Sequence, residues 1–452
     1  MSSLFIALAT LILIPISLSY SYVGLYGWFW ISFMNPHRLV YGPATDLPFA
    51  AIFAGVTILS FLFGKDKKSI PLNAITILIM AIALWITLSS VFALVPDWSW
   101  YYWDRYIKIM LMTLVAIPIL NTVVRIQGVV WVSVLSIGYF GVTGGIFTIL
   151  TAGAHRVYGP PGSFIADNNH LALALLMTVP FLRYLQLQTE SRLVRNVLLA
   201  SMVLLTFSII GSQSRGAFLG IIAMSLFLIA KSRHKIGLGL LVIVLATVAA
   251  FFVPERWVSR METIENYEED ESAQSRLLSW RFHYEIAKRK PIVGGGFGLY
   301  YDAELYKSIV PEARKVHNAH SIYFQVLGQQ GFGGLALYLA LLYFIWRQWG
   351  KVARLAKDSP ELSWAVDLAA MAQVSQIAFM VSGAFLNLAY FDFFFLMAAL
   401  SVATEQVVNK ALATGDAAGS AVLSDSEPAN GTRGRPPFGR PRGRPAQLLR
   451  RR

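Results

Sequence analysis

Long apolar stretches separated by short polar connections make up most of the chain. Most of these stretches extend for about 17 to 25 residues, the length that an α-helix needs to cross roughly 30 Å of hydrocarbon. A continuous apolar stretch satisfies its own backbone hydrogen bonds only as a helix, because the strands of a barrel would alternate apolar and polar residues. The pattern therefore predicts an all-α integral membrane protein with about twelve transmembrane helices. These lie near residues 4–33, 47–63, 70–95, 105–122, 128–150, 168–188, 195–212, 216–231, 236–253, 320–346, 363–387 and 389–407.

The first stretch, residues 4–33, is too long for one straight span. Pro15 or Gly24 could divide it into a span and an interfacial segment, because both residue types weaken a helix. The start of the chain has no basic segment followed by a small-residue cleavage site. We therefore expect a retained span there and not a removed signal peptide.

One polar interruption is much longer than the others and sets the domain organisation. We expect the first nine spans in residues 1–253, a long periplasmic loop containing helices in residues 254–319, and three further spans in residues 320–407. Residues 408–452 are rich in Gly, Ala, Ser, Pro and Arg, a composition that cannot form a core. They are predicted to be a disordered tail.

Lysine and arginine residues mark alternate connections as cytoplasmic. With twelve spans both chain ends lie in the cytoplasm, and if residues 4–33 form two spans only the N-terminus changes side. The intervening connections face the periplasm of a bacterial inner membrane. The periplasmic connections are residues 34–46, 96–104, 151–167, 213–215 and 254–319. The cytoplasmic residues are Lys65, Lys67, Lys68, Arg125, Arg192, Arg195, Lys231, Arg233, Lys235, Arg347, Lys351, Arg354 and Lys357.

Composition supports a membrane protein and restricts the chemistry. Hydrophobic residues are 56% of the chain and charged residues only 14%, against about 25% charged in soluble proteins. The absence of cysteine excludes disulfides, thiolate metal ligands and thiol nucleophiles. The net charge of +13 belongs mainly to the tail, because residues 433–452 hold eight arginines and no acid. Membrane lipid is the expected partner of this tail. Two Arg-Gly-Arg-Pro stretches resemble minor-groove binding motifs, but we expect no nucleic acid.

Two histidines end the long loop, in the segment His317-Asn-Ala-His320. A neutral imidazole at the outer interface can accept a proton from a sugar hydroxyl near neutral pH. His320 is the candidate catalytic base, and His317 is the alternative. Two histidines three residues apart could also bind a metal, but no nearby carboxylate or third histidine completes a site, so no metal or other cofactor is expected. A purely structural role stays open for both.

Two arginines on the same side of the membrane are candidate anion ligands. Arg215 follows Ser212-Gln-Ser in a short outer turn, and Arg276 lies on a predicted helix of the long loop with Trp280. Guanidinium groups match phosphate oxygens bidentately, and an arginine at membrane depth is usually paired or functional. Snorkelling to the interface is the alternative for Arg215. The glycine-rich residues 294–298 end the predicted helix in a loop whose backbone could approach a ligand, although a flexible turn explains it equally well.

The connection 151–167 and the start of the following span supply weaker candidates. Arg156, Asn168 and Asn169 are candidate substrate-binding residues, since amides and guanidinium groups hydrogen-bond sugars and phosphates. Asn168 is alternatively a helix N-cap, and His170 a buried histidine with a hydrogen-bond partner. Tyr323, one turn after His320, is a further candidate for substrate binding.

In this order and topology, these motifs resemble the O-antigen ligase and O-antigen polymerase superfamily. Tyr22-Val-Gly and Met34-Asn-Pro-His-Arg-Leu further resemble its O-glycosylation ligase branch associated with exosortase systems. The resemblance extends from about Tyr22 to Val407. Its matching residues are Ser214-Arg215-Gly216-Ala217, then Arg276, Trp280, Ala287, Pro291, Gly294 and Gly296, then His320-Ser-Ile-Tyr-Phe-Gln325 and Gly331.

The resemblance implies a GT-C-type inverting glycosyltransferase. It would transfer a glycan from undecaprenyl pyrophosphate to lipid A-core oligosaccharide without a metal. Arg215 and Arg276 would hold the pyrophosphate and His320 would activate the acceptor hydroxyl. Ser321 departs from the asparagine common in the family, which puts an orienting role of that position in doubt. The alternatives are a polymerase that joins lipid-linked repeats, a protein O-glycosylation ligase, and, in another class, a lipid-linked sugar transporter.

Overall fold

The computed structural model describes residues 3–42, 45, 47–64, 66, 68–231 and 271–424, and all regular structure in that part is helical. The chain divides into two compact units, Met1–Asn409 and Lys410–Arg452. The described elements are α1 (Ser3–Ser19), α2 (Ser21–Met34), η1 (Pro36–Leu39), α3 (Phe49–Phe63), α4 (Ala74–Val91), α5 (Pro96–Ile119), α6 (Val123–Leu150), α7 (Asn168–Gln188), α8 (Arg192–Gly211), α9 (Arg215–Lys231), α12 (Glu271–Arg289), η3 (Leu299–Tyr301), α13 (Ala303–Ile309), α14 (Ile322–Ala356), η4 (Pro360–Leu362), α15 (Ser363–Gly383) and α16 (Asp392–Ser424).

Several described helices have the length and composition of membrane spans. Six qualify within the described part, and they contain α4, α6, α7, α8, α14 and α15. Shorter apolar helices lie at Leu8–Ser19, Phe49–Phe63 and Arg215–Ala230. The prediction of an all-helical integral membrane protein is confirmed. The count of twelve stays a prediction. The expected span 236–253, the first part of the long loop and residues 425–452 of the tail lie outside the described residues. Residues 408–424, which were expected to be disordered, form the end of α16.

The first apolar stretch is two helices, and the division falls at neither expected residue. Tyr20 leaves helical geometry, with φ −135° and ψ 101°, and separates α1 from α2. Pro15 stays inside α1. Gly24 lies inside α2, where a Cβ would meet the side chain of Thr57 on α3. That glycine therefore serves close helix packing and does not end a helix.

Small residues allow the central helices to pack closely. Gly145 of α6 faces the backbone of Leu204 on α8, and Gly141 faces the side chain of Leu205. Gly211 at the end of α8 faces Thr148 of α6. Transmembrane helices associate through such small-residue contacts because lipid offers no hydrophobic driving force between helices.

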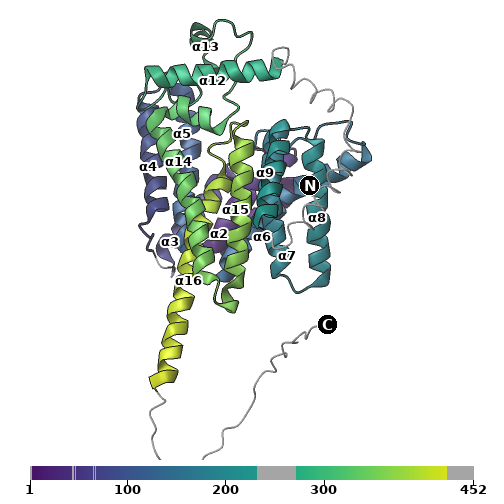
Figure 1. The fold of residues 1–452 in the computed structure, drawn as a ribbon, viewed down its shortest axis with the longest axis vertical. Coiled ribbons are helices and arrows are strands. Elements are labelled where there is room, and N and C mark those ends of the chain that lie inside the picture. The colour runs from purple at the N-terminus through teal and green to yellow at the C-terminus, as the bar shows by residue number, and fades with distance from the viewer. Residues whose placement is uncertain are drawn as a thin grey trace, which may run out of the picture. The chain divides into compact units, whose positions relative to one another are not determined.

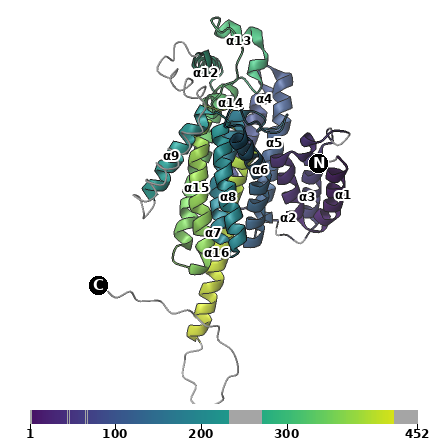
Figure 2. The same cartoon turned by 90° about the vertical axis from the view of Figure 1, so that its right-hand side faces the viewer.

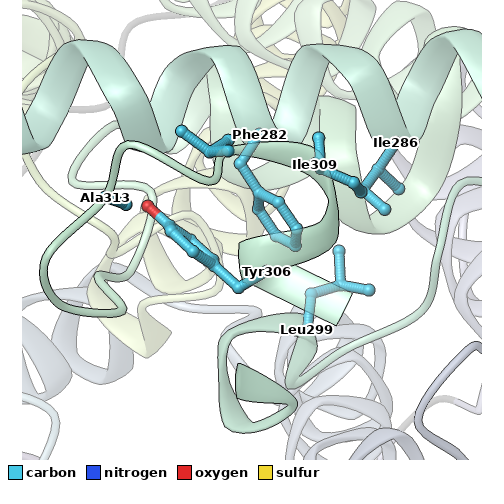
Figure 3. Close-up of a cluster of buried hydrophobic side chains, with 7 residues drawn as sticks. Phe282, Ile286, Leu299, Tyr306, Ile309 and Ala313 are labelled. Atoms are coloured by element: carbon cyan, nitrogen blue, oxygen red, sulfur yellow. The ribbon is translucent and has the colours of Figure 1, made fainter. Parts of the chain in front are cut away.

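The described part of the long loop forms a small folded layer. Helix α12 lies crosswise to the long helices at one end of the first unit, with α13 beside it (Figures 1 and 2). Figure 3 shows Phe282 and Ile286 of α12 directed toward Tyr306 and Ile309 of α13 and toward Leu299. Burial of these side chains holds α12 in place, since each contributes on the order of 1.5–3 kcal/mol.

Helix α14 is broken, which the apolar pattern of residues 320–346 did not predict. Gly331 adopts φ 69° and ψ −173°, and the helix begins at Ile322 and ends at Ala356. The break frees carbonyl groups that other elements satisfy: Gly296 N–H donates to Gln329 O at 2.9 Å, and the Trp85 indole donates to Gln330 O at 3.0 Å. A broken membrane helix is stable only where its backbone groups find such partners.

Candidate functional site

Helix α12 fixes the backbone immediately before His320. The Ser279 hydroxyl donates to the carbonyls of His317 at 3.2 Å and Asn318 at 2.8 Å. The Trp280 indole donates to the carbonyl of Ala319 at 2.8 Å. Three successive carbonyls are therefore bound to adjacent residues of one helix, which determines the position of His320.

His320 itself has a strained backbone. Its φ is 45°, in the left-handed region that few non-glycine residues adopt. Such strain costs on the order of 1–3 kcal/mol and occurs preferentially at functional sites. The following residue, Ser321, is the N-cap of α14, because its hydroxyl accepts from the N–H of Phe324. Ser321 thus caps the start of α14.

The electrostatic environment keeps His320 neutral at physiological pH. Burial lowers the pKa of His320 to about 4, and the positive charge of Arg276 adds to this shift. His170 and His317 act in the same direction, whereas the carboxylate of Asp167 opposes it. The structure therefore brings Arg276, predicted from sequence, into electrostatic contact with His320. It also places Asp167 and His170, at the start of α7, in the electrostatic environment of His320.

Arg276 and Arg215 occupy different elements. Arg276 is half-buried on α12, three and four residues before Ser279 and Trp280, and so lies on the same helix face. Arg215 is the first residue of α9. The Ser214 hydroxyl accepts from the N–H of Ala217 at 3.3 Å, which is the geometry of a helix N-cap.

The turn that carries Arg215 is bound to the start of α7. The Asn168 amide donates to the carbonyl of Ser212 at 2.7 Å, in a buried bond. Asp167 and His170 lie on either side of Asn168, and both affect the pKa of His320. The bond from Asn168 to Ser212 therefore connects the turn that carries Arg215 with the environment of the candidate base. Gln213 in the same turn has φ 57°, so each of the two motifs contains a strained non-glycine residue.

Three candidate substrate-binding residues bind other parts of the protein. Arg156 Nε donates to Gln213 Oε1 at 3.3 Å, and the Tyr323 hydroxyl donates to the carbonyl of Met380 at 3.0 Å. The N-cap of α7 is Asp167 and not Asn168, and it accepts from the backbone and side-chain amides of Asn169. The alternative interpretation of Asn168 as a helix cap was wrong by one residue.

The glycine-rich loop approaches protein backbone. Gly294, Gly296 and Gly298 have φ between 69° and 82°. A Cβ on Gly294 would collide with the backbone of Gly331, and one on Gly296 would collide with Ala93. The backbone of these glycines was expected to approach a ligand closely. In the structure it closely approaches α14 and the residues that follow α4.

His317 lies near His320, with ring centroids 6.4 Å apart. Within the described ranges, no three His, Cys, Asp or Glu side chains are grouped as ligands of a metal ion would be.

A polar cavity of about 140 Å³ is the feature that sequence reasoning missed. His170 Nε2 and Asn387 Oδ1 are 3.2 Å apart at its wall, and Gln325 Oε1 accepts from the N–H of Ala389 at 3.2 Å. The sequence signal for this cavity was the pair Gln325 and Gln329, which lie four residues apart inside a predicted apolar span. The lining residues are Tyr102, Arg105, Tyr106, Ser163, Phe164, His170, Tyr300, Asn318, Gln325, Gln329, Asn387 and Leu388.

Comparison with known families agrees with this geometry. Residues 200–339 match the O-antigen ligase family, and this range includes Arg215, Arg276 and His320. Residues 1–190 match a family of unknown function. No curated protein matches the chain. The match does not reach the N-terminal motifs that resemble the exosortase-associated branch, so that finer assignment stays a prediction. The match at residues 200–339 supports the O-antigen ligase and polymerase superfamily for this part of the chain.

Proposed function

We propose that this protein is a metal-independent O-antigen ligase of lipopolysaccharide biosynthesis. It would transfer a glycan from undecaprenyl pyrophosphate to a sugar hydroxyl of lipid A-core oligosaccharide, with inversion at the anomeric carbon. The observations that carry the proposal are the fixed backbone before His320 and the contribution of the Arg276 charge to the lowered pKa of His320. A neutral base and a cation that binds phosphate are the two groups that this reaction requires.

His320 would act as the general base. The acceptor oxygen attacks the anomeric carbon from the face opposite the pyrophosphate, and its proton passes to a ring nitrogen of His320. The bond between the anomeric carbon and the pyrophosphate oxygen breaks, and lipid pyrophosphate leaves as an anion. Because that anion is already a good leaving group, the reaction needs charge stabilisation on the leaving side and no general acid.

Arg276 and Arg215 would supply that charge stabilisation. Guanidinium groups form bidentate hydrogen bonds with phosphate oxygens, and fixed positive charge stabilises the negative charge that develops on a leaving group. Donor binding would also activate the base. The pyrophosphate neutralises the charge of Arg276, which is one cause of the lowered pKa of His320. His320 then becomes more basic when the donor is present.

The proposal includes the location of the reaction. The long helices would form a GT-C-type bundle in the bacterial inner membrane, with α12 and His320 on the periplasmic side, where lipid-linked donor and lipid A-core acceptor meet. The basic tail would lie on cytoplasmic membrane lipid. Two hydrogen bonds between connections predicted to be periplasmic support their location on the same side of the membrane. Leu94 N–H donates to Gly295 O at 2.8 Å, and the Asn168 amide donates to Ser212 O.

A transfer assay tests the proposal. Purified full-length protein in nanodiscs is mixed with lipid-linked glycan, lipid A-core acceptor and EDTA, and product is measured. The test variant is His320→Asn, because asparagine tolerates a positive φ but is not a base. We expect a rate loss of at least 10²-fold, in the range typical of general-base removal. Retained activity in His320→Asn would refute the mechanism.

The acceptor requirement distinguishes the ligase from its alternatives. Extension of the lipid-linked glycan without lipid A would identify a polymerase, and glycan on added protein would identify a protein ligase. Movement of the donor across liposome membranes without any glycosyl transfer would identify a transporter.

A further inference from the structure

The polar cavity is separate from the three residues assigned to catalysis, since none of Arg215, Arg276 and His320 lines it. It lies close to them, however. His170 lines the cavity and also contributes to the electrostatic environment of His320, and Asn318 lies two residues before the base. A ligand in the cavity would therefore be adjacent to the reacting groups.

The side chains that line the cavity suit a ligand with many hydroxyl groups. Four of them are primary amides, each of which can donate and accept hydrogen bonds. These are Asn318, Gln325, Gln329 and Asn387. The volume of about 140 Å³ is close to that of an engineered cavity, of about 150 Å³, that binds a benzene ring. One sugar ring fits this size and an oligosaccharide does not.

One amide has an unmet hydrogen-bonding requirement. Gln329 is 4% exposed, and its Oε1 has no hydrogen-bond partner. A buried acceptor without a partner destabilises the protein, and a ligand hydroxyl would satisfy it. The neighbouring pair His170 and Asn387 is already bonded at 3.2 Å and is held in position for a ligand.

The cavity carries positive charge. Arg105 is its one lining residue with a formal charge, and no Asp or Glu is among the lining residues. The guanidinium lies over the ring of Phe164, 3.4 Å from the centroid, which fixes its plane and leaves its edge for hydrogen bonds. The buried carboxylate of Asp392 interacts with Arg105 electrostatically but does not line the cavity.

We infer that this cavity is a subsite for one acidic sugar unit of the glycan substrate, with the sugar carboxylate at Arg105 and its hydroxyls at Gln329 and Asn387. The role of the subsite in glycosyl transfer rests on the proposed function. Its binding chemistry does not, and can be measured without any transfer.

Binding of two monosaccharides tests the inference. Full-length protein in nanodiscs is titrated with glucuronate and with glucose, and binding is followed by saturation-transfer NMR. We expect glucuronate to bind about tenfold more tightly than glucose, because a guanidinium–carboxylate pair is a strong charge-assisted bond. Arg105→Gln should remove that preference and leave glucose binding unchanged. Lys108→Gln is the matched control, since Lys108 is an exposed cation of the same helix that does not line the cavity.

A second variant keeps the test decisive if Arg105→Gln does not fold. Gln329→Glu preserves the size of the side chain but adds a negative charge, so it should weaken glucuronate binding about tenfold more than it weakens glucose binding. Equal binding of both sugars to the unmodified protein would overturn the inference. Displacement of glucuronate by equimolar inorganic phosphate would also overturn it and identify a phosphate site.

The outcomes separate this inference from the proposed function. Glucuronate binding that depends on Arg105, in a protein without transferase activity, would support the subsite and refute the ligase. Efficient transfer by a protein that does not distinguish glucuronate from glucose would support the ligase and refute the acidic subsite.

Discussion

The indole N–H of Trp280 donates to the carbonyl oxygen of Ala319 at 2.8 Å, while its ring stacks on Phe324 with centroids 5.0 Å apart. One side chain of the outer helix α12 thus binds both the residue before His320 and the first turn of α14. The angle between the two ring planes is 6°, so the stacking is nearly parallel. The position of the candidate base consequently depends on a helix 39 residues earlier in the chain.

Trp280→Phe should separate these two contacts. Phenylalanine retains an aromatic ring against Phe324 but loses the donor to Ala319, at a cost of about 1 kcal/mol in stability. We expect kcat to fall about tenfold with little change in donor KM, because misplacement of a base affects the chemical step. Steady-state transfer kinetics measure this. Trp100→Phe, at an exposed tryptophan of α5, is the control and should behave as the unmodified protein.

Arg276→Gln should change the pH dependence of transfer. His320 must be neutral to accept a proton, so the rate falls as pH decreases through its pKa, which is about 4 in the free protein. Removing the positive charge of Arg276 raises that pKa toward its ordinary value. The acid limb of kcat/KM for the acceptor should therefore move to higher pH, in addition to the loss of donor binding.

Arg276→Lys is the matched variant for that experiment. It keeps the charge and should leave the acid limb near that of the unmodified protein, while donor binding weakens through loss of the bidentate contact. An acid limb that does not move in Arg276→Gln would contradict the coupling of the two residues.

Asn168→Leu should destabilise the protein more than Asn169→Leu. The buried Asn168 amide satisfies the carbonyl of Ser212, so its loss leaves a buried acceptor unpaired at a cost of about 1–3 kcal/mol. Asn169 is only half-buried and bonds locally to Asp167. Thermal unfolding in detergent compares the two. Equal midpoints would show that the bond to Ser212 is not structural, and would favour the substrate-binding role considered for Asn168.

Gly294→Ala should be strongly destabilising, by about 3 kcal/mol or more, because the residue has φ 69° and its Cβ would collide with the backbone of Gly331. Gly55→Ala is the control. Gly55 lies within α3, and a Cβ there meets no atom within 4 Å. Alanine in a helix interior is more stable than glycine by roughly 0.5–1 kcal/mol, so the two substitutions should have opposite signs. Chemical unfolding of both variants checks this.

The sequence predicted the helical membrane fold because hydrocarbon thickness and helix rise determine the length of an apolar span. It did not predict the interruptions. Tyr20 separates α1 from α2 although neither Pro15 nor Gly24 does, and Gly331 breaks α14 because distant side chains satisfy the freed carbonyls. Such breaks depend on tertiary partners, which no local pattern reveals.

The candidate site was predictable to the extent that its chemistry requires particular side chains on the outer side of the membrane. Arg276 and His320 were predicted in this way, and the charge of Arg276 contributes to the lowered pKa of His320. The cavity was not predicted, because its amides come from the end of the long loop, from α14 and from the connection after α15, which are apart in the sequence. Asn168 and Tyr323 stay candidates for substrate binding, and in the structure both side chains donate to backbone carbonyls.

The interruption at Gly331 has a mechanical consequence. The short segment Ile322–Gln330 is bonded through its last carbonyls to Ser89, Trp85 and the glycine-rich loop, so it forms one rigid piece with the outer layer. The remainder of α14 is bonded to other partners, since Phe332 N–H donates to Pro291 O at 2.9 Å and the Gln376 side chain of α15 donates to Leu342 O at 2.6 Å. Gly331 therefore marks the point where α14 passes from the outer layer into the helix bundle, and the segment that begins beside His320 is anchored independently of the rest of its helix.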